Sequence, residues 1–254
     1  MDSEIGELEE IGQLLLDVGS KLMVSGASTD RVRVTVDRMA DALGCDVELF
    51  ITHRALSMTI KNASGLSSSS ILRTPPHAVN YGLVSGISII SWRMVEEKWS
   101  VEKIKAELAQ LESKPRYPRL LVLSLVALAG ASFCRIFGGD GMEMANTFFA
   151  TFFGLLVLQE ARKSRFNPYL CVLFASISAS LVSGIGYKLG LSDTMEHAFA
   201  ASVLFLIPGI PLINALTDMI DGNVLNGWVR GVHAFLTIFM VAVGLLFAML
   251  VYRI

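Results

Sequence analysis

The sequence is poor in charged residues and in cysteine. Only 17% of its 254 residues are Asp, Glu, Lys or Arg, whereas about 25% is usual in soluble domains. Hydrophobic residues make up 53% of the chain, and the mean hydropathy is +0.56. The net charge of −2 provides no basic excess for binding nucleic acid. This composition argues against a disordered chain and a wholly soluble enzyme, and it indicates a membrane protein.

Residues that could bind a metal or carry out catalysis are few and scattered. None of the cysteines and histidines shows the short spacing of a CxxC or Cys/His metal site. They are Cys45, Cys134, Cys171, His53, His77, His197 and His233. The sequence therefore predicts no metal, no cofactor and no catalytic site, and it predicts that the protein is not an enzyme.

The charges that are present divide the chain into two parts. Residues 1–118 carry 16 acidic and 13 basic side chains, as a soluble domain would. Residues 119–254 carry only 7 acidic and 8 basic side chains, a depletion typical of a membrane region. We therefore expect an α-helical membrane protein with an N-terminal α/β domain at 1–118 and a transmembrane domain at 119–254.

The pattern of residues 1–118 predicts helices on both sides of three short strands. Helical spacing runs over 5–24 and again from Ser28 or Thr29 to Gly44, and it returns from residue 80 to about 112 with Ser100 as a cap. Strands are expected at 47–52, 56–60 and 67–72. The acidic N-terminus lacks the features of a signal peptide, so we expect this domain to be cytoplasmic.

The second part contains long uncharged stretches. A helix needs about 20 apolar residues to cross the hydrocarbon core. Five transmembrane helices are therefore expected, at about 118–137, 142–160, 166–188, 197–220 and 229–252.

The charges of the expected loops predict an orientation. Seven basic residues fall on the side of the N-terminal domain and three on the other side. The first group comprises Lys114, Arg116, Arg119, Arg162, Lys163, Arg165 and Arg230, and the second comprises Arg135, Lys188 and Arg253. Because positive loops favour the cytoplasm, the N-terminal domain is expected inside and the C-terminus outside.

The fourth expected span is interrupted by Pro208, Gly209 and Pro211. Each proline removes a backbone donor, and broken membrane helices of this kind often build substrate and ion sites in transporters. The two prolines and the glycine are therefore candidate substrate-binding residues. A proline kink without a binding role is the alternative.

Polar residues follow this interruption on one helical face. Asn214, Asp218 and Asp221 lie at i, i+4 and i+7. Asn214 is a candidate substrate ligand and Asp218 a candidate proton-coupling residue, because a carboxylate near the membrane usually faces a cavity or a partner. Asp221 is expected in the solvated interface.

Arg135 is the basic residue within the first apolar stretch. Its guanidinium suits a two-pronged contact with a substrate carboxylate. It could equally extend towards the lipid headgroups, because Gly138-Gly139-Asp140-Gly141 follows directly.

Five motifs resemble a known family over nearly the whole chain. The chain resembles the N-terminal half of the bacterial threonine/serine exporter family and, within it, the stand-alone subunit of two-component systems. The stretches that carry the resemblance are Gly26-Ala27-Ser28 with Arg31-Val32, Ala42-Leu43-Gly44, Arg116-Tyr117-Pro118-Arg119, Ser132-Phe133-Cys134-Arg135, and Ala201 to Met219 with its Pro-Gly-Ile-Pro centre.

The resemblance implies a secondary transporter of the inner membrane that exports small metabolites. Fused members would export threonine and serine, and the split pair a C4 dicarboxylate such as succinate. It also implies a second, smaller membrane subunit and the use of the proton gradient. No catalytic residues are carried over. A membrane channel or sensor gated by the cytoplasmic domain, a membrane-anchored enzyme within 1–118 and a homo-oligomer remain open.

Overall fold

The computed structural model describes residues 2–75, 79–115, 117–190 and 196–253. Two residues used above, His77 and Arg116, lie outside the described residues. The chain forms two compact units. The first consists of Met1–Pro115 and Ile210–Gly231, and the second of Arg116–Gly209 and Val232–Ile254. Residues 210–231, expected within the transmembrane domain, thus pack with the N-terminal part of the chain.

Two helices open the first unit, as the sequence predicts. Helix α1 covers Asp2–Val24 and α2 covers Thr29–Ala42. Ser28 is the N-cap of α2, and its hydroxyl accepts a hydrogen bond from the backbone N–H of Arg31. Between the helices, Gly26 has a φ of +96°, a conformation that favours glycine. The turn at 25–28 can therefore be short and sharp.

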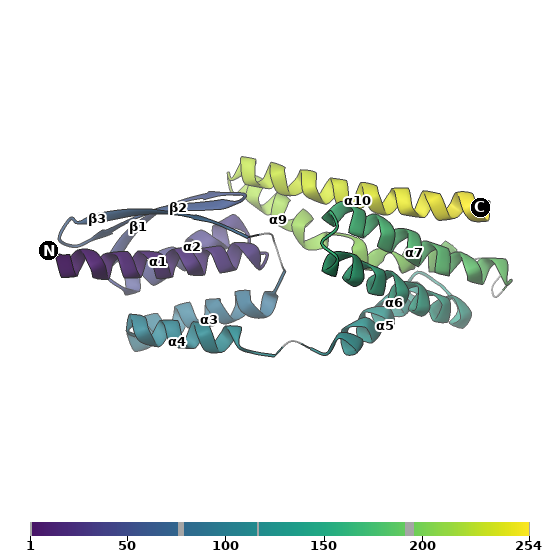
Figure 1. The fold of residues 1–254 in the computed structure, drawn as a ribbon, viewed down its shortest axis with the longest axis horizontal. Coiled ribbons are helices and arrows are strands. Elements are labelled where there is room, and N and C mark those ends of the chain that lie inside the picture. The colour runs from purple at the N-terminus through teal and green to yellow at the C-terminus, as the bar shows by residue number, and fades with distance from the viewer. Residues whose placement is uncertain (1, 76–78, 116, 191–195, 254) are drawn as a thin grey trace. The chain divides into compact units, whose positions relative to one another are not determined.

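A three-stranded antiparallel sheet follows, in the order β1-β2-β3. Strand β1 covers Cys45–Thr52, β2 covers Ala55–Asn62 and β3 covers Ser67–Arg73. The register pairs Thr52 with Ala55. Alternate residues of β2, at Leu56, Met58 and Ile60, are buried. The sheet therefore has one face towards the helices, where α1 contacts β2 and β3 and α2 contacts β1 (Figure 1).

Helices α3 (Tyr81–Glu97) and α4 (Val101–Glu112) complete the N-terminal part of this unit. Ser100 is the N-cap of α4, as the sequence predicts. Helix α3 packs against α1, α2 and α4. The fully buried side chains of the core are mainly aliphatic and come from α1, α2, β2, α3 and α4: Leu15, Val18, Leu22, Val32, Met39, Leu56, Met58, Ile60, Ile87, Met94 and Ile104.

The second unit is a bundle of helices. Helices α5 (Arg119–Ile136), α6 (Gly141–Lys163) and α7 (Pro168–Lys188) follow one another through short loops. Helix α6 packs against both α5 and α7, and the short helix α8 (Glu196–Ser202) contacts all three. A Cβ on Gly154 would lie 2.8 Å from that of Ala179, so a glycine is needed for α6 and α7 to approach this closely.

Two further helices belong to both units. Helix α9 covers Gly209–Ile220, and α10 covers Val224–Tyr252. The boundary between the units crosses α9 at its first residue and α10 at Gly231.

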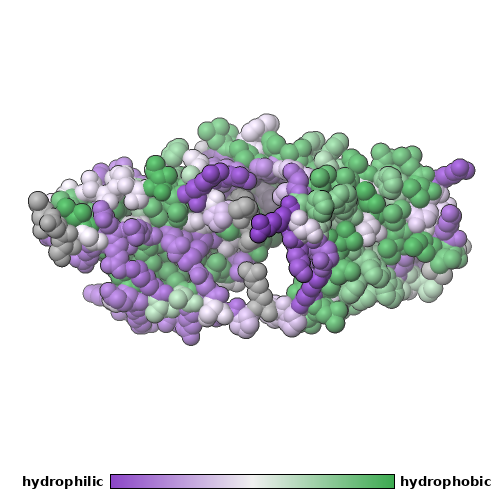
Figure 2. Space-filling model, viewed as in Figure 1, coloured by the Kyte–Doolittle hydropathy of each residue, from purple (hydrophilic) through white to green (hydrophobic). Residues whose placement is uncertain are grey.

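Four helices are long and apolar enough to cross a membrane, namely α5, α6, α7 and α10, within the described residues. A fifth span results if α8 and the following turn form one bent span with α9. On the visible face, hydrophobic residues gather over the helices of the second unit, whereas hydrophilic ones are common over the first (Figure 2). The chain is therefore a mostly helical, multi-pass membrane protein with a small N-terminal sheet.

Candidate functional site

The helix that leads to the candidate site is broken at Pro208. A 3-10 turn, η1 (Leu204–Leu206), follows α8, and Ile207 then has an extended backbone. Helix α9 begins at Gly209, so Pro211 lies in its first turn, where a missing N–H leaves no bond unmade. The predicted interruption is thus present at Ile207 and Pro208, whereas Pro211 does not extend it. Whether Pro208, Gly209 and Pro211 bind substrate stays a prediction.

Asp218 lies in α9 and is fully buried. Its Oδ1 accepts a hydrogen bond of 2.8 Å from the backbone N–H of Thr29. Its Oδ2 lies 3.2 Å from Nη1 of Arg230. The two groups form an ion pair, but their geometry is not that of a hydrogen bond. Because the side chain of Arg230 is only 10% exposed, the two charges are largely shielded from water and depend on each other.

The position of Thr29 explains why its N–H is available. It is the first residue of α2, directly after the N-cap Ser28. The first N–H groups of a helix have no partner within the helix, and together they carry a partial positive charge. The carboxylate of Asp218 therefore meets two positive groups, the N-terminus of α2 and the guanidinium of Arg230.

Asn214 lies one helical turn before Asp218 in α9 and contacts the turn that precedes α2. Its Nδ2 donates a 2.7 Å hydrogen bond to the backbone carbonyl of Gly26. Asn214 and Asp218 thus share a face of α9, as their spacing predicts, and both face the segment between α1 and α2. Neither the binding of substrate by Asn214 nor proton coupling by Asp218 is tested by this geometry.

Residues of α10 and of the turn before it extend the polar network. Asn226 donates 3.0 Å to the carbonyl of Ile51 and lies 3.5 Å from Oγ1 of Thr29. Asn223 accepts a 3.3 Å hydrogen bond from Nη2 of Arg33. Sequence reasoning missed these asparagines, and it placed Arg230 among the loop charges. We name this set, Gly26, Thr29, Asn214, Asp218, Asn226 and Arg230, the Asp218 network.

Arg135 belongs to the other unit and lies in the last turn of α5. Its Nη1 donates 3.1 Å to the carbonyl of Gly139, in the loop that follows. The residue is exposed. Arg135 shares its unit with Pro208 and Gly209, whereas Asn214 and Asp218 belong to the first unit. Both interpretations of the role of Arg135 stay predictions.

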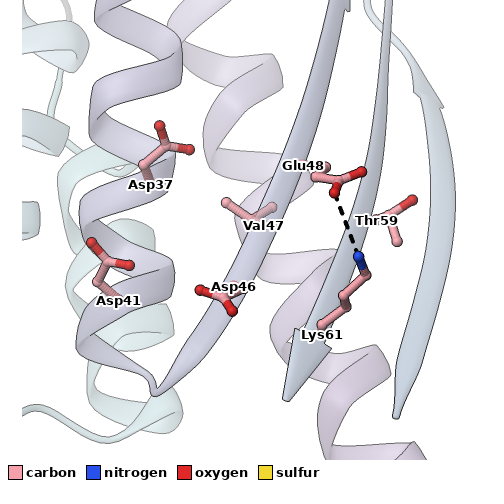
Figure 3. A pocket seen from close by; sticks show the side chains of 7 residues that line it. All are labelled: Asp37, Asp41, Asp46, Val47, Glu48, Thr59 and Lys61. Carbon is pink, nitrogen blue, oxygen red and sulfur yellow. Dashed lines mark hydrogen bonds and ion pairs between the residues drawn. The ribbon is translucent and has the colours of Figure 1, made fainter. Parts of the chain in front are cut away.

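The N-terminal unit also carries a groove, with a volume of about 470 Å³. Asp37 and Asp41 of α2 line it from one side, opposite Asp46, Glu48 and Lys61 of the sheet (Figure 3). Burial raises the pKa of Asp37, and the neighbouring charges of Asp41 and Asp30 add to this against the opposing effect of Arg33. An excess of carboxylates repels a carboxylate substrate, so this groove is unsuited to one. The described residues contain no group of three or more His, Cys, Asp or Glu side chains that could hold a metal.

Comparison with known proteins gives one consistent result. Residues 13–252 match the model of a family described as "Putative threonine/serine exporter". The "Probable succinate transporter subunit YjjP" of Klebsiella aerogenes is 29% identical over 253 residues, which cover 98% of this chain and 96% of the relative. The protein of the same name from Escherichia coli K12 is 29% identical over 245 residues, covering 95% and 94%. No solved structure matches the chain.

The family match covers almost all of the described helices and strands, from within α1 to the end of α10. The helices that could span a membrane and the broken span before α9 are consistent with it. The chain therefore belongs to the threonine/serine exporter family, whose model spans both of its units.

Proposed function

We propose that this chain is one subunit of a secondary transporter that exports small carboxylate metabolites across the inner membrane. The substrate would be threonine and serine or a C4 dicarboxylate such as succinate. The family match and the two relatives named as succinate transporter subunits support this class of function. The word subunit in their names supports the need for a second membrane protein. No enzymatic reaction is part of the proposal.

The buried pair of Asp218 and Arg230 is the observation that carries the proposal. A guanidinium binds carboxylates in a two-pronged geometry and stays charged at all working pH values. When Asp218 takes up a proton, Arg230 loses its counter-ion, and a substrate carboxylate can replace it. Loss of the proton restores the pair of Asp218 and Arg230 and releases the substrate. Binding of the substrate carboxylate at Arg230 would thereby depend on the protonation of Asp218.

The Asp218 network would also transmit the change in charge of Asp218 to the N-terminal domain. Thr29 donates to the carboxylate that changes charge, and Asn214 and Asn226 bind backbone carbonyls of the same domain. A neutral Asp218 is a weaker acceptor for the N–H of Thr29, because hydrogen bonds to charged groups are roughly twice as strong. The same network supports the second candidate function, a channel or sensor gated by this domain.

We propose the orientation that the loop charges predict, with the N-terminal domain in the cytoplasm and the C-terminus outside. Without Arg230, which is buried in α10, six basic residues on the side of the N-terminal domain against three on the other side support it. In this orientation the Asp218 network lies near the cytoplasmic ends of its helices, where an exporter receives its substrate.

Transport by reconstituted vesicles tests the proposal. The chain is reconstituted with and without the second membrane subunit, and the accumulation of labelled succinate and threonine is measured under an imposed pH gradient. We expect accumulation against a concentration gradient only with both subunits. A flux that merely equalises the concentrations would support a channel, and full activity of this chain alone would refute the need for a partner.

A further inference from the structure

We propose that Glu143 and His197 form a second proton-binding site, between the start of α6 and the start of α8 in the second unit. The site deepens the proposed function and rests on it, because it would load the proton that drives export. It involves three elements of the second unit: the start of α6, the start of α8 and the loop between α5 and α6.

Glu143 is buried although it lies in the first turn of α6. Its side chain is 3% exposed, and its Oε2 lies 3.4 Å from Nδ1 of His197 in α8. Oε2 also accepts a 3.0 Å hydrogen bond from the backbone N–H of Asp140. Neither Oε1 of Glu143 nor Nδ1 of His197 has a hydrogen-bond partner among the described residues. A buried carboxylate with one unsatisfied oxygen is costly, and a proton removes that cost.

The loop before α6 is built closely around this pair. A Cβ on Gly139 would lie 3.2 Å from Oε2 of Glu143 and 2.5 Å from Sγ of Cys134. Gly138 has a φ of +103°, and its Cβ would lie 3.6 Å from Nε2 of His197. Gly139 therefore lets the loop pass close to the buried carboxylate of Glu143, whereas the side chain of His197 is 36% exposed.

A structural role explains only part of this arrangement. Asp140 and Glu143 form a capping box, in which each side chain accepts a backbone N–H of the other residue. That role needs one oxygen of Glu143 and accounts for neither the buried second oxygen nor the contact with His197. Because glutamine serves equally well at this position of a capping box, replacement by glutamine removes the charge and keeps the cap.

Buried hydroxyls continue from Glu143 into the bundle. Thr147 and Thr151 follow on the same face of α6 and are fully buried. On the neighbouring helix α7, Ser180 and Ser183 are fully buried, and their hydroxyls lack partners among the described residues. The side chain of Asn146 donates 2.8 Å to the carbonyl of Ser183, which places Ser183 beside the first turns of α6. The interior near Glu143 is thus polar along both helices.

The charged and titratable groups around the pair come from every neighbouring helix. Asp140 directly precedes α6, and Cys134 approaches from α5. The guanidinium of Arg135 donates a hydrogen bond to the carbonyl of Gly139. At this end of α7, Lys188 lies 5.9 Å from the ring of Tyr252. Among the described residues, His197 is therefore the basic side chain that contacts Glu143, and histidine is the residue type that changes charge near neutral pH.

The proposed orientation places the site on the outer side of the membrane. Helix α5 ends and α6 begins on the outer side, where the proton concentration is higher in a respiring bacterium. A proton bound there by Glu143 and His197 would enter the polar interior of the bundle. The site would thus act before Asp218 in the inward movement of the proton.

Vesicles containing both subunits test the site with two measurements, accumulation of labelled succinate driven by a pH gradient and exchange of succinate without a gradient. We expect Glu143→Gln to lose the driven accumulation and to keep the wild-type exchange rate. Glu143→Asp should recover part of the driven accumulation, and His197→Gln should shift its pH dependence. Glu160→Gln is the matched control, because Glu160 lies near the other end of α6, is half-exposed and pairs with Arg119.

The outcomes separate this site from the proposed function. If the wild-type protein neither accumulates nor exchanges succinate or threonine, the proposed function fails. If the wild-type protein is active and Glu143→Gln keeps its full pH-driven accumulation, the second site is refuted. Equal loss of exchange and driven accumulation in Glu143→Gln would also refute it, because that loss indicates a structural role.

Discussion

The carboxylate of Asp218 accepts a hydrogen bond of 2.8 Å from the backbone N–H of Thr29, 189 positions earlier in the chain. This bond joins α9 to the N-terminus of α2 within one compact unit. The guanidinium of Arg230 lies 3.2 Å from the other oxygen. A residue predicted to take part in proton coupling therefore holds together two segments that are remote in sequence.

Removal of Arg230 should destabilise the first unit. Arg230→Gln leaves the buried carboxylate of Asp218 without a counter-ion, at a cost of about 3–5 kcal/mol. Thermal unfolding in detergent measures the change. The double variant Asp218→Asn/Arg230→Gln should recover most of the loss, and Arg162→Gln, at an exposed arginine, should have little effect. A single variant as stable as the wild type would contradict the importance of the pair.

Asn214→Ala should weaken the apparent affinity for substrate and leave the pH dependence of export intact. Loss of its hydrogen bond to the carbonyl of Gly26 also removes about 1 kcal/mol of stability. The measurement is the concentration of labelled succinate or threonine at half-maximal export. Asn223→Ala, which alters the contact with Arg33, is the matched control. An unchanged half-maximal concentration in Asn214→Ala would argue against a role in binding.

The stability of the N-terminal unit should depend on the ionisation of Asp37. Burial raises the pKa of this carboxyl above its value in the unfolded chain. Its protonated form therefore favours the folded state, and this contribution is lost as the pH rises through the pKa of the folded state. Asp37→Asn should raise the melting temperature at pH 7 and lose this effect towards pH 3. Glu9→Gln, at an exposed carboxylate of α1, should show no such pH dependence, and an equal gain at both pH values would contradict the prediction.

The orientation predicts that a cysteine tag at the C-terminus is labelled in intact cells by a reagent that cannot cross the membrane. The native cysteines, Cys45, Cys134 and Cys171, are buried and should give little background. The same tag at the N-terminus should be labelled only after lysis. The opposite pattern for the two tags would reverse the orientation.

The sequence predicted the secondary structure of residues 1–115 closely because its signals are local. Serine caps at Ser28 and Ser100 mark helix starts, and the alternation of apolar residues in β2 matches its buried face. The interruption at Pro208 was equally evident, since a proline cannot donate a backbone hydrogen bond. That Pro211 belongs to the following helix depends on where α9 begins, and a residue pattern alone does not fix this boundary.

The partners of Asp218 could not be predicted from the sequence. The N–H of Thr29 is a backbone group, so no side-chain pattern reveals it. Arg230 is separated from Asp218 by a turn at 221–223, where Gly222 has a φ of +83°. Because the turn interrupts the helix, spacing along the sequence no longer predicts which residues share a face with Asp218. Glu143 gave no signal either, because its burial depends on Gly139 and His197, which pack against it in the folded bundle.

The measurement that tests the central claim most directly is export by Asp218→Asn under an imposed pH gradient, with both subunits present and equal amounts of protein in the membrane. If protonation of Asp218 controls the binding of the substrate carboxylate at Arg230, the variant should lose pH-driven export of labelled succinate or threonine while the wild-type protein retains it. Wild-type pH dependence in Asp218→Asn would contradict the account and would leave Asp218 with only its structural contacts to Thr29 and Arg230.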